Sequence, residues 1–310
     1  MKKLKVLSKG DTIGIISVSS PVEKEVVDKT VKYFEDLGYK TKLGKNILAS
    51  NGYMAGSIEQ RVFDLHSMFK DPKVNAIICA WGGTSANQLL QYIDYDLISN
   101  NPKIFVGLSD PSVLSLAIST KSKIPTFHGP TGYNFGTTNL TPYTEKYFFK
   151  ALSSIEPIGL IEELSKREII KEGNVEGDII GGNLTLLQTI LGTPYEPDWN
   201  NKILFWEDLF VEPHTIDLIL TQFDNAGIFA KIKGMVIGKL VECNEEEYTI
   251  SESFSELIER LTKRYNFPIL YNVDLGHSDD KITIPIGAKC KMVLEDKTMQ
   301  FEIIESPFSL

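Results

Sequence analysis

The sequence predicts an α/β protein with two domains, an N-terminal one built on a mainly parallel sheet and a C-terminal one of mixed α/β structure. In the first half, short Val- and Ile-rich runs alternate with amphipathic stretches, as expected of a parallel sheet with helices on both faces. The 310 residues are enough for two hydrophobic cores. We expect the domains to span residues 1–155 and 175–310, joined by a linker at 156–174.

The N-terminal half contains apolar runs of β type with helical patterns between them. The second predicted helix begins with Ser57-x-x-Gln60, the pattern of a capping box, and the first ends at Gly38, a C-cap glycine. The strands are expected within residues 10–21, 41–43, 74–81, 104–106 and 123–128, and the helices at 23–37, 57–69, 85–92 and 111–118.

Three turns follow strands of this predicted sheet. Ser19-Ser20, Gly82-Gly83 and Ser109 each come directly after an apolar run, and a loop rich in Gly, Pro, Thr and Asn follows at 129–142. Ligands of parallel sheets bind beyond the carboxyl ends of the strands, so we expect these segments to share one functional edge.

The C-terminal half is less regular and predicts a mixed α/β domain. Its last three β-type runs, at 282–284, 290–294 and 299–304, are typical of an antiparallel tail. This half opens with residues 175–183. The other strands are expected at 202–206, 234–238 and 269–273, and the helices at 184–191, 213–223 and 254–265.

Composition excludes several classes of protein. No apolar run approaches the ~20 residues that span a bilayer, and no signal-peptide pattern opens the chain, so a cytoplasmic location is expected. The net charge of −9 argues against a nucleic-acid polymer or an anionic membrane as partner. Cys79, Cys243 and Cys290 are too widely spaced for a zinc motif or a disulfide framework, and we expect no metal and no cofactor.

The run Lys103-Ile-Phe-Val-Gly-Leu-Ser-Asp-Pro111 is an apolar strand that ends in a turn carrying Ser109. Gly107 gives a permissive backbone before the turn, and Pro111 fits the start of the following helix. Strand, serine turn and helix form the layout of a nucleophile elbow. The small-x-Ser-x-small signature is incomplete, however, and a Ser-Asp turn is also common as a simple helix cap.

Four histidines are available as a base for such a serine. His66 and His214 fit the surface or packing positions of helices. His128 ends a strand at the predicted edge, and His277 lies in a polar loop between two strands, so both are candidates.

An acid and a glycine pair complete the candidate set. Glu207 ends an apolar strand, where it could orient an imidazole or simply cap the next turn. Gly82-Gly83 could cradle a phosphate, although no phosphate-binding motif is present. The pair could instead present an amide to an oxyanion, with the amide of Asp110 as second donor.

These residues resemble the LD-carboxypeptidases, serine peptidases that include murein tetrapeptide enzymes and microcin C self-immunity peptidases. The resemblance covers nearly the whole chain. Its markers are Gly10-Asp-Thr-Ile-Gly, Gly82-Gly83 with Asn87-x-Leu-Leu, Ile93-Asp-Tyr-Asp, Asn101-Pro-Lys-Ile, Gly107-Leu-Ser-Asp, Gly181-Gly-Asn-Leu, Leu204-Phe-Trp-Glu-Asp and His277 with Ile284-Pro-Ile-Gly.

The resemblance implies a Rossmann-like or flavodoxin-like parallel-sheet domain, a C-terminal α/β domain and a Ser-Glu-His triad. It implies that Ser109 is the nucleophile, Glu207 the orienting acid and His277 the base. It also implies that the amides of Gly83 and Asp110 form the oxyanion hole. The same resemblance implies a homodimer.

The substrate stays open between a murein-derived L,D-peptide, consistent with peptidoglycan recycling, and a microcin C-like peptidyl nucleotide. Trp81 stands where murein-type members often carry arginine, and the surrounding sequence is more similar to that of the immunity branch. However, residues 129–175 contain no tryptophan to stack a nucleobase. We expect Trp81, Gly82 and Asn183 to contact the substrate. The alternative is a non-catalytic protein that binds a small ligand on a Rossmann-like scaffold.

Overall fold

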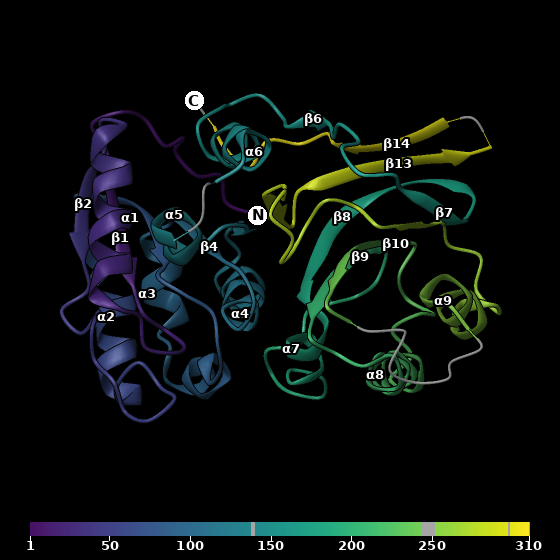
Figure 1. Cartoon of the computed structure of the whole chain (residues 1–310), viewed down its shortest axis with the longest axis horizontal. Helices are drawn as coiled ribbons and strands as arrows, with labels where there is room; N and C mark the ends of the chain where they lie inside the picture. Colours follow the sequence, from purple (N-terminus) through teal and green to yellow (C-terminus); the bar gives the residue numbers. More distant parts are fainter. Residues whose placement is uncertain (138–139, 244–251, 297, 310) are drawn as a thin grey trace.

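The protein, described as a computed structural model over residues 1–137, 140–243, 252–296 and 298–309, contains two sheets that lie side by side (Figure 1). The N-terminal sheet has the strand order β12-β5-β4-β3-β1-β2, and the C-terminal sheet has the order β6-β14-β13-β8-β9-β10-β11-β7. This arrangement confirms the predicted α/β class with two unlike sheets.

The N-terminal sheet pairs β1 to β5 in parallel, in the order 2-1-3-4-5 of flavodoxin-like folds. Its central strands are almost fully buried because helices cover both faces, which explains their continuous apolar sequence. The strands are β1 (Thr12–Ile16), β2 (Lys40–Leu43), β3 (Val74–Cys79), β4 (Ile104–Gly107) and β5 (Thr126–His128).

The helices expected at 23–37, 57–69 and 111–118 form close to their predicted positions. The capping box of α2 forms, with the Ser57 side chain accepting from the Gln60 amide and the Gln60 side chain accepting from the Ser57 amide. The helices are α1 (Lys24–Asp36), α2 (Ile58–Lys70), α3 (Tyr95–Asn100), α4 (Ser112–Ser122), α5 (Gly132–Thr137) and α6 (Pro142–Leu152).

Three helical segments differ from the prediction. The helix expected at 85–92 is a 3₁₀ helix (Ala86–Tyr92), and α3 after it was not predicted, although the Asp94 side chain caps it by accepting from the Leu97 amide. The predicted loop at 129–142 contains α5, and residues 138–139 of that loop lie outside the described residues.

The C-terminal sheet is mixed, as predicted, with β8 to β11 parallel and its edges antiparallel. Residues 156–174, expected as a linker, contribute β6 (Gly159–Leu160) and β7 (Glu168–Lys171) to it. The other members are β8 (Gly173–Asn183), β9 (Lys202–Leu209), β10 (Gly234–Val241), β11 (Ile269–Tyr271), β13 (Lys289–Glu295) and β14 (Thr298–Ile303), with helices α7 (Leu184–Gln188), α8 (Pro213–Asn225) and α9 (Phe254–Thr262).

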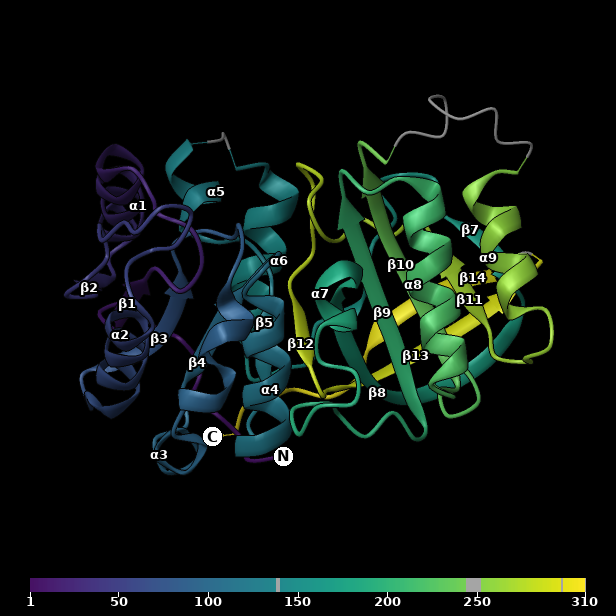
Figure 2. The same cartoon turned by 90° about the horizontal axis from the view of Figure 1, so that it is seen from below.

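One strand of the predicted antiparallel tail belongs to the other sheet. β12 (Ile284–Ile286) pairs antiparallel with β5 instead of joining β13 and β14 (Figure 2). Its three side chains are all buried, so the pairing covers an apolar edge of the N-terminal sheet. The C-terminal half is thereby anchored to the N-terminal sheet, directly after the loop that carries His277.

No helix in the described residues is long and apolar enough to cross a bilayer.

Candidate active site

Ser109 lies in a tight turn between β4 and α4. Its φ of +66° is in the left-handed region, which is costly for a residue with a side chain and typical of an exposed nucleophile on an elbow. The Ser112 amide donates to the Ser109 carbonyl at 2.8 Å, which closes the turn. Pro111 is the residue before α4 and has a helix-compatible φ of −59°, so it continues directly into the helix.

The Gly82-Gly83 loop packs directly against this turn. A Cβ on Gly82 would lie 2.8 Å from the Ser109 Cβ, and a Cβ on Gly83 would lie 2.1 Å from the Ser20 Oγ. Gly83 also has a φ of +111°. Glycine therefore allows the loop backbone to approach Ser109 at position 82 and Ser20 at position 83.

Two backbone amides at this contact are available as donors. In the described part of the chain, neither the Gly83 amide nor the Asp110 amide has an acceptor. The Asp110 side chain is turned inward, where its Oδ2 accepts from the Ala86 amide at 2.7 Å and links the elbow to the chain after the glycine pair. Its burial raises the pKa of Asp110.

Gly83→Ala is expected to lower kcat/KM by roughly 100-fold or more, the cost of displacing one oxyanion donor. The added Cβ must push Ser20 or the loop away. Gly227→Ala is the matched control, because Gly227 also has a positive φ, +73°, but a Cβ there would meet no atom within 4 Å. Steady-state kinetics of both variants, with thermal unfolding, separate loop displacement from backbone strain. Equal activity losses in the two variants would contradict the expected role of the Gly83 amide as an oxyanion donor.

Glu207 and His277 form a buried pair. The His277 Nδ1 lies 2.6 Å from the Glu207 Oε2, although the two residues are seventy positions apart. The approach depends on Gly276, where a Cβ would lie 2.4 Å from the same carboxylate oxygen. Glu207 lies within β9 and is fully buried, whereas part of His277 is exposed.

The pair stabilises opposite charges. Burial opposes the imidazolium, but the Glu207 charge and its hydrogen bond outweigh burial and raise the pKa of His277. Burial likewise opposes the carboxylate, but the charge and hydrogen bond of His277 outweigh it and hold the pKa of Glu207 below its ordinary value. This carboxylate can therefore fix the tautomer of His277 and stabilise its protonated form.

Of the other histidines, His66 and His214 lie on α2 and α8, whereas His128 lies beside this pair. His66 accepts from the Asp94 amide at 2.9 Å, and His214 is an exposed residue near Glu212. His128 is fully buried, with its Nε2 3.7 Å from the Glu207 Oε1. It therefore cannot reach a substrate directly.

A cavity of about 430 Å³ joins these elements between the two halves of the chain. Ser109 and the glycine pair line it from the N-terminal half, and His277 lines it from the other half. The complete lining is Trp81, Gly82, Gly83, Leu108, Ser109, Thr131, Tyr133, Asn134, Leu140, Leu209, His277, Asp279 and Lys281.

The predicted substrate contacts divide into two groups. Trp81 and Gly82 line the cavity, and the Trp81 ring stacks on Tyr133 with centroids 5.1 Å apart. Asn183 does not line it: this buried side chain caps α7, accepting from the Leu186 amide, and donates to Asp208 at 2.9 Å. Its side chain therefore links the start of α7 to β9 within the fold.

Sequence reasoning missed Tyr133 and Lys281. Tyr133 lies in the unpredicted α5, and Lys281 follows His277 by four residues in a loop without periodicity. Lys281 is only 4% exposed, and its Nζ donates to the Asp279 carbonyl at 3.2 Å. Burial lowers the pKa of Lys281. The available signal was that Lys281 lies in the same loop as the candidate base His277.

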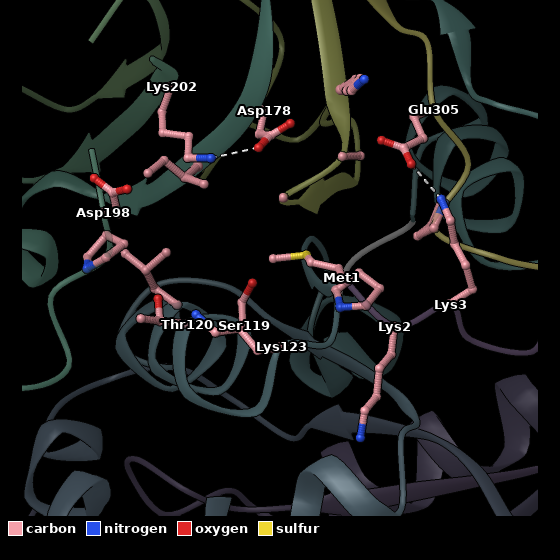
Figure 3. A pocket seen from close by; sticks show the side chains of 18 of the residues that line it. Met1, Lys2, Lys3, Ser119, Thr120, Lys123, Asp178, Asp198, Lys202 and Glu305 are labelled. Carbon is pink, nitrogen blue, oxygen red and sulfur yellow. Dashed lines mark hydrogen bonds and ion pairs between the residues drawn. The ribbon is translucent and has the colours of Figure 1, made fainter. Parts of the chain in front are cut away.

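A second cavity, of about 460 Å³, lies by the N-terminus (Figure 3). Its charged side chains include two ion pairs, Lys202 with Asp178 at 2.6 Å and Lys3 with Glu305 at 2.7 Å. None of the predicted site residues is among the described residues that line it. The cavity that contains Ser109 is therefore the candidate active site.

Comparison with protein families agrees with this geometry. Residues 13–129 match the LD-carboxypeptidase N-terminal domain, and residues 176–292 match the LD-carboxypeptidase C-terminal domain. The chain belongs to the LD-carboxypeptidase family. The two matches contain the serine turn in one domain and Glu207 and His277 in the other, which agrees with a site between the halves.

Individual members of the LD-carboxypeptidase family are similar over almost their whole length. A probable murein peptide carboxypeptidase of Bacillus subtilis is 37% identical, covering 97% of this chain and 94% of the relative. The microcin C7 self-immunity protein MccF of Escherichia coli is 29% identical, covering 94% and 93%. Both branches of the family are thus represented among the relatives.

Solved structures related to MccF are similar to this chain over almost its whole length. An MccF-like protein from Bacillus anthracis is 34% identical, with a TM-score of 0.91 over 98% of this chain and 100% of the other. MccF in complex with glutamyl sulfamoyl guanosine has a TM-score of 0.89 at 26% identity, covering 99% of each chain.

Proposed function

We propose that this protein is a serine hydrolase that cleaves an amide bond beside a free carboxylate, through an acyl-enzyme on Ser109. The observation that carries the proposal is the 2.6 Å contact between Glu207 and His277, with His277 and Ser109 on the wall of one cavity. Membership in the LD-carboxypeptidase family supports the same chemistry.

In the proposed reaction, the Ser109 Oγ attacks the scissile carbonyl carbon while His277 takes the hydroxyl proton. The negative charge that develops on the carbonyl oxygen is stabilised by the amides of Gly83 and Asp110. Collapse breaks the C–N bond, and His277 gives its proton to the leaving amine. Water, deprotonated by His277, then hydrolyses the ester and restores Ser109.

Lys281 is the reason for proposing a substrate with a free carboxylate. Among the described residues that line the cavity it is the one lysine or arginine, and it has no ion-pair partner in the described part of the chain. A buried ammonium with one carbonyl acceptor is poorly compensated, and a substrate carboxylate would complete its hydrogen bonds. The charge of the exposed Asp279 at the same wall favours the ammonium form of Lys281.

Lys281→Met is expected to lower kcat/KM roughly 10- to 100-fold for a substrate with a free carboxylate, the value of one charge-assisted hydrogen bond. The loss should come mainly from KM. A matched substrate whose terminal carboxylate is an amide serves as control and should lose less than threefold. Steady-state kinetics on both substrates test the assignment, which fails if both lose activity equally.

The choice between substrate classes can be tested directly. Turnover of a murein L,D-tetrapeptide and of an aminoacyl sulfamoyl adenosine should be compared by mass spectrometry of the products. The stacked Trp81 and Tyr133 rings offer a flat surface on which a nucleobase could stack. For this reason the comparison includes the nucleotide substrate. We expect hydrolysis of at least one class, with loss in Ser109→Ala. Tight binding without turnover of either would favour the non-catalytic alternative.

A further inference from the structure

His128 lies on the far side of the Glu207 carboxylate from His277. It ends β5, is fully buried, and packs edge-on against Phe205 with ring centroids 5.3 Å apart. Its Nε2 faces the Glu207 Oε1 at 3.7 Å. In the described part of the chain, neither of these two buried atoms has a hydrogen-bond partner within normal limits. Two unpaired polar atoms facing each other in a core require an explanation.

The other ring nitrogen determines which way the proton points. The backbone amide of Asn183 lies 3.4 Å from the Ser112 Oγ and can donate to it. The Ser112 hydroxyl can then direct its own hydrogen to the His128 Nδ1, which is also 3.4 Å away. The proton of a neutral His128 then sits on Nε2, toward Glu207. The opposite tautomer would set a nitrogen lone pair against a buried carboxylate, which is repulsive.

Burial keeps this imidazole neutral. It lowers the pKa of His128 to about 4, with the Glu207 charge opposing that effect and the His277 charge adding to it. At neutral pH, His128 therefore acts as an N–H dipole rather than as a second cation. A dipole can stabilise the carboxylate without competing with His277 for its negative charge.

We propose that His128 is a positioning residue of the active site, whose Nε2–H holds the Glu207 Oε1 so that Oε2 stays aimed at His277. The proposal rests on the proposed function, because it assigns a second supporting layer to the same triad. His128 acts through Glu207 and contacts no substrate.

Other groups around Glu207 do not replace this contact. Asp208 is a neighbouring carboxylate bound to Asn183 and Thr185, and the Cys243 thiol and the Lys281 ammonium also lie near enough to act on the Glu207 charge. The Asn183 side chain also favours the ionised form of Glu207, but its side-chain amide donates to Asp208. His128 is the group that faces the free oxygen.

The test compares His128→Leu with His128→Gln, in which the side-chain amide can place an N–H near the lost Nε2. We expect His128→Leu to lower kcat roughly 10- to 100-fold with KM within twofold, and His128→Gln to recover most of the loss. The acid limb of the kcat/KM profile should move to higher pH in His128→Leu, because Glu207 loses a donor and the pair holds its proton more tightly.

Thr126→Val is the matched control. Thr126 is equally buried, two residues earlier on the same strand, and its Oγ1 bonds to the Ser115 carbonyl rather than to the site. Its kcat and pH profile should match wild type. Equal losses in His128→Leu and His128→Gln, or an unmoved acid limb, would overturn the proposal.

A measurement on the unaltered protein keeps the proposal testable if His128→Leu fails to fold. Nitrogen-15 NMR of the histidine rings should show His128 neutral, as the Nε2–H tautomer, from pH 5.5 to 8.5. An Nδ1–H tautomer or a charged ring would overturn it. This readout does not depend on turnover, so it can fail while Ser109 proves catalytic, and it can succeed while the proposed reaction fails.

Discussion

Replacing Ser109 by alanine is expected to lower kcat/KM by roughly 10⁴-fold or more, the range seen when a triad nucleophile is removed. The change deletes one oxygen from a turn whose backbone is held by the Ser112 amide and by the close packing of Gly82. Substrate affinity should persist because the rest of the cavity wall is unchanged. The measurement is single-turnover kinetics with binding of the same substrate by calorimetry.

Ser119→Ala is the control for this variant. Ser119 is a buried serine on the same helix that follows the elbow, and it lines the second cavity rather than the candidate site. Its kinetics should stay within twofold of wild type. Turnover by Ser109→Ala within tenfold of wild type would refute the covalent mechanism.

Glu207→Gln should lower kcat/KM by roughly 10³- to 10⁴-fold, because an amide can hold the imidazole in the wrong tautomer and cannot stabilise its charge. The remaining activity should have its acid limb at lower pH. In the wild type, Glu207 outweighs burial and raises the pKa of His277, so without that charge burial dominates and the pKa falls. The full pH profile of kcat/KM tests both statements.

Glu162→Gln provides the comparison for charge removal. Glu162 is an exposed carboxylate paired with Lys146, and its loss should leave both the rate and the acid limb unchanged. An acid limb that stays in place or rises in Glu207→Gln would show that this carboxylate does not control His277.

Much of the fold could be predicted because its signals are local. Alternating apolar strands and capped helices predicted the parallel sheet of β1 to β5, and the Ser57 capping box placed the start of α2 correctly. The position of β12 could not be predicted, since three buried residues carry no information about which sheet edge they cover. The strands β6 and β7 were missed for a related reason, because both are short and only partly apolar.

The candidate site divides in the same way. Ser109 and the glycine pair follow strands of one sheet, so the rule for parallel sheets placed them at one edge. The pairing of Glu207 with His277 joins distant segments, and for it the sequence offered residue types and a family resemblance but no distance. Lys281 was missed because a lysine in a polar loop is ordinarily exposed, and only the packed structure makes it a buried charge.

Labelling with a small fluorophosphonate tests the central claim most directly. Peptide mapping by mass spectrometry should find one adduct per chain, on the peptide that contains Ser109. The adduct should be absent in Ser109→Ala and should form at least 100-fold more slowly in His277→Ala, since an unassisted serine is a weak nucleophile. Absence of an adduct in wild type, or an equal rate in His277→Ala, would contradict an activated serine at this site.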